Sequence, residues 1–208
     1  ATHAGISVGE DGASHQCCED IGLMRTIPGM VIINPADDIE ARAAVFAAAE
    51  YVGPVYMRFG RLAVPRINNE DYKFEIGKAV KLKDGDDLTI IATGLMVSRA
   101  IEASEILSEA GINARVLNIH TIKPIDREAV IAAAKETGAI VTAEEHSIIG
   151  GLGAAVAEVV SETVPVPVLR VGVNDTFGCS GPGAELLDVF GLNAENIAAR
   201  AKEALKMK

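Results

Sequence analysis

Residues 88–119, LTIIATGLMVSRAIEASEILSEAGINARVLNI, contain the pattern that decides the fold. The runs at 88–92 and 114–119 are short, apolar and rich in branched side chains, which is typical of buried strands. Residues 97–110 between them have the spacing of an amphipathic helix, and Gly111 stands where helices favour glycine at their C-terminal end. A strand, a helix and a second strand in this order predict a parallel pair joined by a crossover.

The same alternation continues along the chain on both sides of this unit. We predict further strands at 77–81, 139–142 and 166–171, and further helices at 126–136, 152–161, 184–190 and 193–206. Strands that alternate with amphipathic helices indicate a sheet that is covered on both faces. Residues 75–208 are therefore predicted to form a complete small α/β domain with a mostly parallel five-stranded sheet.

A shorter α/β block precedes this domain. Residues 30–34, MVIIN, and 54–59, PVYMRF, predict two strands, and Pro35 with the acids after it predicts the start of a helix that ends near Glu50. About 65 residues bury only a marginal core. We therefore expect residues 1–66 to be the C-terminal part of a domain, followed by a polar linker at 67–74.

Composition and charge exclude several classes of protein. The 208 residues are 49% hydrophobic and 23% charged, as in a soluble globular protein, and no apolar run approaches the length of a membrane span. The net charge of −10 disfavours nucleic acid and anionic membranes as partners. The three cysteines are odd in number and two are adjacent, so we expect reduced thiols and a cytoplasmic location.

The densest chemistry lies in residues 2–16, THAGISVGEDGASHQ, which contain His3, Asp11 and His15. Imidazoles donate hydrogen bonds to oxyanions and move protons near neutral pH, and a carboxylate accepts hydrogen bonds from hydroxyls. Glycines let a backbone turn tightly and let a ligand come close. The combination suits a polyhydroxylated anion such as a sugar phosphate. The alternative is a polar turn whose side chains cap nearby helices.

Two other features favour structural roles. Residues 150–155, GGLGAA, superficially resemble a dinucleotide loop but lack its last glycine, and the acids Glu144 and Glu145 just before them would repel a diphosphate. Close packing of a strand on a helix explains this segment better. His120, before TIKP, is predicted to lie in a structural turn.

The string at 2–16 closely resembles the transketolase signature of the pyrimidine-binding domain. MRTIPGMVIINPADDIEA and PVYMRFGR resemble the segments that follow the signature in this family, the second carrying its substrate arginine. HTIKPID, VTAEEH, GGLGAAVAE and GVNDTFGCSGPGAELLDVFGL resemble the family's C-terminal domain. Over essentially its whole length, the chain is similar to the C-terminal section of a split transketolase.

The resemblance implies a role for each polar residue of the candidate site. His3 and Arg58 would contact the phosphate of the sugar, and Asp11 would bind a donor hydroxyl. His15 would act as the catalytic residue, close to the C1 hydroxyl or carbonyl of the ketose. The alternative for Arg58 is an ion pair with an acid at the end of a strand, and Gln16 is expected only to shape the loop. A metal site at the two histidines and Asp11 explains them less well, so no metal ligand is predicted.

The resemblance also implies an enzyme, a transferase of the pentose phosphate pathway that moves a two-carbon ketol unit between ketose and aldose phosphates. Such enzymes use thiamine diphosphate and Mg²⁺. The glutamate that activates this cofactor, and the diphosphate and metal site, lie in parts of the family that this sequence does not contain. We therefore expect no cofactor-binding residue in this chain and no activity from the chain alone.

The expected partner is an N-terminal transketolase subunit or segment, in a homodimer or a heterotetramer. Two related thiamine enzymes are alternatives: deoxyxylulose-phosphate synthase and the β subunit of a 2-oxoacid dehydrogenase. A non-catalytic truncated or proteolytic domain is the third alternative.

Overall fold

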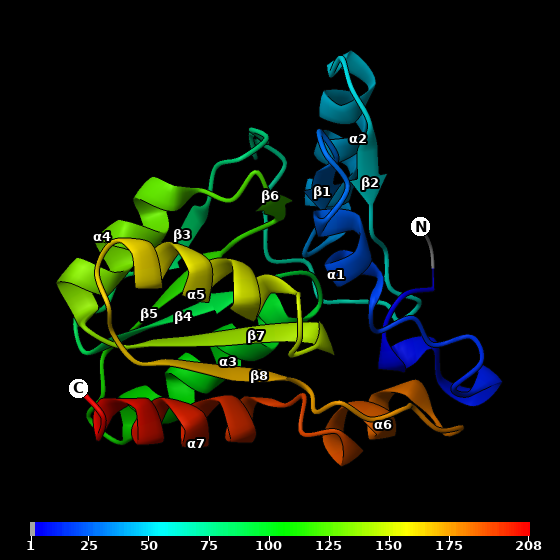
Figure 1. Ribbon diagram of the computed structural model, residues 1–208. Helices are drawn as coiled ribbons and strands as arrows, with labels where there is room; N and C mark the ends of the chain where they lie inside the picture. Colours follow the sequence, from blue (N-terminus) through cyan, green and yellow to red (C-terminus); the bar gives the residue numbers. More distant parts are fainter. Residues whose placement is uncertain (1–2) are drawn as a thin grey trace.

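Two sheets organise the chain in the computed structural model, which describes residues 3–208 (Figure 1). The larger sheet has the order β3-β5-β4-β7-β8 and the smaller one has the order β2-β1-β6. The larger sheet consists of β3 (Val80–Lys83), β4 (Leu88–Ala92), β5 (Ala114–Asn118), β7 (Ile140–Ser147) and β8 (Val168–Val173). Only β3 runs antiparallel to its neighbour. The prediction of a mostly parallel five-stranded sheet is confirmed.

Helices cover both faces of the larger sheet (Figure 1). One face carries α3 (Met96–Glu109) and α7 (Ala194–Leu205), and the other carries α4 (Arg127–Thr137) and α5 (Leu152–Glu162). Successive side chains of a strand point to opposite faces. In the central strand, Ile90 therefore packs in one apolar core and Ile91 in the other, and both are fully buried.

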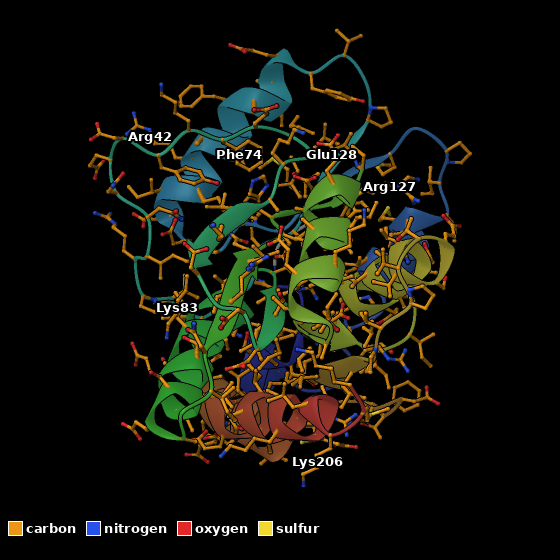
Figure 2. All side chains as sticks on the ribbon, turned by 90° about the vertical axis from the view of Figure 1, so that its left-hand side faces the viewer. Arg42, Phe74, Lys83, Arg127, Glu128 and Lys206 are labelled. Atoms are coloured by element: carbon orange, nitrogen blue, oxygen red, sulfur yellow. The ribbon has the colours of Figure 1, made fainter. Side chains whose placement is uncertain are left out.

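Polar side chains and glycine fix the ends of two of these helices, α4 and α7. The side chain of Asp126 accepts a hydrogen bond from the amide of Ala129 at the start of α4, and Asn193 does the same for α7. Gly138 ends α4 in the left-handed conformation with φ 66°. Charged side chains such as Arg127 and Glu128 lie on the outside of the fold (Figure 2).

The smaller sheet takes strands from both blocks of the chain. β1 (Val31–Ile33) and β2 (Val55–Met57) are parallel and are connected by α2 (Asp38–Glu50), as predicted. β6 (Thr121–Lys123) pairs antiparallel with β1. The sequence predicted a turn here, because three residues are too few to show an alternating pattern. His120 is buried beside this strand, with its ring 4.2 Å from that of Phe74.

Three short helices complete the described chain: the 3-10 helix η1 (Ile6–Asp11), α1 (Asp20–Arg25) and α6 (Gly183–Val189). The sequence predicted only α6. Strand β7 also continues to Ser147, where the sequence predicted an end at residue 142. This extension places residues 144–146 beside the N-terminal loop. Among residues 3–208, no helix has the length and apolarity needed to cross a bilayer.

Candidate active site

The N-terminal loop, residues 3–16, is held against the end of β2. The amide of Ala4 donates to the carbonyl of Phe59 at 3.1 Å, and the amide of Gly5 donates to the carbonyl of Cys17 at 2.8 Å. These bonds place His3 next to residues 58–61, although more than fifty positions separate them in the sequence. The side chain of His3 is exposed.

An arginine and an acid form an exposed pair on this loop. Nη1 of Arg61 lies 2.6 Å from Oδ2 of Asp11 and 2.9 Å from the carbonyl of Val8. The two side chains are 43% and 47% exposed. The pair places a guanidinium and a carboxylate side by side at the surface of the loop, where both could bind a polar ligand.

Arg58, by contrast, lies in the interior of the protein. Its side chain is 2% exposed, and its Nε is 2.9 Å from Oδ2 of Asp20. Its Nη2 donates to the carbonyls of Glu145, at 2.9 Å, and Cys17, at 3.2 Å. Burial lowers the pKa of Arg58, but the negative charges of Asp20 and Glu145 outweigh burial and raise that pKa above its usual value. The proposed phosphate contact therefore falls on a buried side chain, in the ion pair that the sequence left as the alternative.

Backbone pairing explains which of the two arginines in PVYMRFGR is exposed. The amide of Arg58 donates to the carbonyl of Ile33 at 2.8 Å, so pairing with β1 continues one residue beyond β2. This pairing holds Arg58 against the interior, whereas Arg61 lies beyond it. Sequence reasoning missed Arg61, and the second arginine of the motif was the only available signal.

His15 and Gln16 close the loop. The exposed His15 has its Nδ1 3.0 Å from Oγ of Ser14. Gln16 is buried, and its Nε2 donates to the carbonyls of Ile6 and Cys179, at 3.0 and 2.9 Å. Gln16 thus ties the start of η1 to the C-terminal part of the chain, in agreement with the predicted role in shaping the loop.

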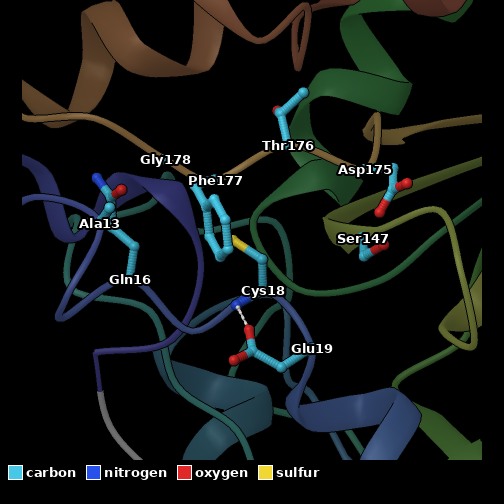
Figure 3. Close-up of a pocket in the computed structure, with 9 residues that line it drawn as sticks. All are labelled: Ala13, Gln16, Cys18, Glu19, Ser147, Asp175, Thr176, Phe177 and Gly178. Carbon is cyan, nitrogen blue, oxygen red and sulfur yellow. Dashed lines mark hydrogen bonds between the residues drawn. The ribbon is translucent and has the colours of Figure 1, made fainter.

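A pocket of about 410 Å³ opens beside the loop (Figure 3). Its lining comprises Ala13, Gln16, Cys18, Glu19, Ser147, Asp175, Thr176, Phe177 and Gly178. Burial raises the pKa of the Cys18 thiol to about 12, so this thiol stays protonated at neutral pH and is a poor nucleophile. His3, Asp11, Arg58 and His15 do not line this pocket.

Behind the loop, the extended end of β7 carries two buried acids that sequence reasoning treated only as an obstacle to nucleotide binding. Oε1 of Glu145 accepts a hydrogen bond of 2.6 Å from the amide of Ser7. Glu144 accepts from the amides of Leu152 and Gly153, at 2.7 and 2.8 Å, at the start of α5. Burial raises the pKa of Glu144 to about 7. A Cβ atom at Gly151 would lie 1.9 Å from Oε2 of Glu144, so the glycine-rich segment is closely packed on β7, as predicted.

Comparison with known proteins identifies the parts of this architecture. Residues 1–66 match the family model of the transketolase pyrimidine binding domain, and residues 77–197 match that of the transketolase C-terminal domain. The chain is 54% identical over 209 residues to a transketolase C-terminal section of Methanocaldococcus jannaschii, covering 99% of this chain and 65% of that protein. It is 47% identical over 204 residues to a 6-deoxy-6-sulfo-D-fructose transketolase subunit of Clostridium sp., covering 98% of this chain and 63% of that subunit.

A solved structure shows the same fold. It is a split-gene transketolase described as an inactive β4 tetramer, with a TM-score of 0.94 and 50% identity. The match covers 100% of this chain and 66% of that one. The chain thus spans just under two thirds of the length of these relatives. It belongs to the transketolase family and carries a fragment of the pyrimidine-binding domain followed by the C-terminal domain.

Proposed function

We propose that this chain is the C-terminal component of a transketolase that moves a two-carbon ketol unit from a ketose phosphate to an aldose phosphate. The observation that carries the proposal is the N-terminal loop. It presents His3, Asp11 and His15 at the surface and brings Arg61 beside Asp11, although the two lie fifty positions apart in the sequence. An exposed cation, a carboxylate and two imidazoles on one braced loop suit a polyhydroxylated anion.

Different residues at the loop bind the ketose and transfer the proton. Arg61, in place of the buried Arg58, and His3 contact the anionic end of the ketose, since a guanidinium and an imidazole give directional hydrogen bonds to oxyanions. Asp11 accepts a hydrogen bond from a sugar hydroxyl, and its pairing with Arg61 fixes the direction of its carboxylate. His15 holds or moves the proton at the C1 hydroxyl or carbonyl.

In this family, thiamine diphosphate supplies the electron sink for the two-carbon unit. Two observations support the proposal that this group is held outside the described residues. Within residues 3–208, no three His, Cys, Asp or Glu side chains are grouped so that they could bind a metal ion. The carboxylate of Glu144 also occupies the start of α5, where a diphosphate would otherwise find amide donors. We infer that another subunit or segment holds the cofactor with its Mg²⁺, and that the chain alone is inactive.

The proposed partner is an N-terminal transketolase subunit, in a homodimer or heterotetramer located in the cytoplasm. The proposed substrates are sugar phosphates of the pentose phosphate pathway. The Clostridium relative is named for a sulfo-sugar, so the assay compares donors that carry a phosphate with a donor that carries a sulfonate.

A ketol-transfer assay tests the proposal. The chain is measured alone and then with its N-terminal subunit and the upstream segment of the pyrimidine-binding domain that carries the activating glutamate, in the presence of thiamine diphosphate, Mg²⁺ and ribose 5-phosphate. Xylulose 5-phosphate, 6-deoxy-6-sulfofructose and pyruvate serve in turn as donors. Activity is expected only in the assembled enzyme and only with a ketose donor. Use of pyruvate would favour the synthase class, and activity of the chain alone would contradict the proposal.

The variant His15→Ala is expected to lower kcat by about 10²–10⁴-fold, as for loss of a general acid or base. Glu10→Ala is the matched control, because Glu10 is exposed on the same loop and has no proposed role in the reaction. An equal loss in both variants would argue against the role of His15.

A further inference from the structure

The carboxylate of Glu145 lies directly beneath the N-terminal loop. Glu145 comes from the buried end of β7 and is 3% exposed. Its Oε1 accepts a hydrogen bond of 2.6 Å from the amide of Ser7, a residue 138 positions away in the sequence. A hydrogen bond from an amide to a carboxylate is shorter and stronger than one between neutral groups. Glu145 thus fixes the backbone of the loop midway between His3 and Asp11.

The loop rests on this carboxylate with no room for a side chain between them. Gly5 adopts φ +88°, and a Cβ atom there would lie 2.3 Å from Cδ of Glu145. The position therefore requires glycine for two reasons: the backbone conformation and the close approach of the carboxylate. Together, the contacts of Gly5 and Ser7 with Glu145 fix the distance between the loop and β7.

A buried carboxylate is costly, so its place under the loop needs a compensating charge. Arg58 provides that charge, and its Nη2 also donates to the main-chain carbonyl of Glu145 at 2.9 Å. Burial raises the pKa of Glu145 above its usual value, and the charge of Arg58 and the amide of Ser7 offset part of that rise. Arg58 is in turn held by Asp20. The buried Arg58 thus supports the acid that holds the loop.

We propose that Glu145 is a positioning residue: its carboxylate fixes the backbone of Gly5 and Ser7 and thereby sets where His3 and Asp11 stand relative to the ketose. Glu145 itself contacts no substrate. The consequence for the reaction rests on the proposed function, whereas the placement of the loop does not. The C-terminal domain would then support the loop, while the pyrimidine-binding domain supplies the side chains that bind the ketose.

The neighbouring acid provides a matched control. Glu144 is as deeply buried as Glu145, but it accepts from the amides of Leu152 and Gly153 at the start of α5 instead of from the loop. A loss of activity that reflects only a weakened C-terminal domain should appear in Glu144→Gln as well as in Glu145→Ala. A loss caused by a displaced loop should appear only when Glu145 is changed. Glu145→Gln keeps one oxygen for Ser7 and should fall between Glu145→Ala and the wild type.

The first test uses the chain alone and needs no activity. In NMR spectra of the Glu145→Ala variant, hydrogen exchange of the Ser7 amide should be about 10–100-fold faster, the range expected for a lost bond to a charged acceptor. The ring signals of His3 should also shift. Neither change is expected in Glu144→Gln. Unchanged exchange at Ser7 in Glu145→Ala would overturn the inference.

The second test uses the assembled enzyme. Glu145→Ala should lower kcat/KM for the ketose donor by about 10–100-fold, because a displacement of about 1 Å has effects of this size. The affinity for thiamine diphosphate should stay unchanged. An equal loss in Glu144→Gln, or no loss in Glu145→Ala, would overturn the inference. If the wild-type assembly transfers no ketol unit, the proposed function fails, and the exchange of Ser7 alone decides whether Glu145 positions the loop.

Discussion

Replacing Arg58 with alanine tests whether this arginine belongs to the interior or to the substrate site. Its guanidinium is 2% exposed, and the Asp20 side chain that it pairs with is 4% exposed. The change would remove the 2.9 Å ion pair with Asp20 and both hydrogen bonds to main-chain carbonyls. It would also leave the acids Asp20 and Glu145 buried without the positive charge that compensates them.

The expected loss of stability follows from that uncompensated charge. Breaking a buried ion pair by removing one partner costs about 3–5 kcal/mol. Domains of this kind are stable by only about 5–15 kcal/mol, so the loss would be a large fraction of the total. Changing Asp20 to asparagine in the Arg58→Ala chain should restore part of the stability, because it removes one of the two stranded charges.

Urea unfolding of the chain measures the effect. Arg66→Ala is the control, since Arg66 pairs with Asp38 at the surface, where the two side chains are 56% and 61% exposed. A surface pair is worth at most about 1 kcal/mol. If Arg58→Ala changes the unfolding free energy no more than Arg66→Ala does, yet weakens the binding of the ketose phosphate, the interior role is refuted and the substrate role first predicted for Arg58 is restored. If the alanine variant does not fold, Arg58→Met keeps most of the side-chain volume and removes only the charge and the donors.

Two further predictions follow from the same geometry. Arg61→Ala should change the unfolding free energy by less than about 1 kcal/mol, since its pair with Asp11 is exposed, but it should raise KM for the ketose phosphate in the assembled enzyme. Unaltered KM would exclude Arg61 from the binding of the anion. Burial raises the pKa of Glu144 from 4.5 to about 7, so this side chain retains a proton in the folded state that it releases in the unfolded state. The contribution of Glu144 to stability should therefore be largest below pH 4.5 and fall by about 3 kcal/mol as the pH rises through about 7. Urea unfolding of the wild type and Glu144→Gln at pH 5 and pH 8 measures this effect, and a difference between the two proteins that is the same at both pH values would contradict it.

The sequence predicted the larger sheet well because its signals are local. Apolar runs, helical spacing and glycines at helix ends are read within windows of a few residues, and they located four of the five strands to within about two residues of their starts. The three-residue strand β6 has no such signal, since only its partner β1 makes it a strand. The proposed domain boundary at 67–74 stays a prediction. Strand β6 follows this boundary in the sequence, but it pairs with β1, which precedes the boundary.

The candidate site shows the same division between local and distant information. The loop motif indicated His3, Asp11 and His15, and the structure places all three at the surface. The motif could not distinguish Arg58 from Arg61, because the difference lies in their distances from acids far away in the sequence. Periodicity and spacing contain no information about such contacts, which depend on how β2 and α1 pack together.

The contacts of the N-terminal loop argue that the C-terminal domain is a structural support for substrate binding. Gln16 donates to the carbonyl of Cys179, and a Cβ atom at Gly183 would lie 2.6 Å from the carbonyl oxygen of Ser7. With Glu145, these contacts hold η1 from below at three separate points of the C-terminal domain, and Figure 1 shows α6 next to this loop. A loop held at three points has few backbone conformations available, so the entropy of ordering its backbone is lost during folding and need not be lost again when a ligand binds. The C-terminal domain can therefore contribute to affinity through the backbone of a loop that belongs to the neighbouring pyrimidine-binding domain.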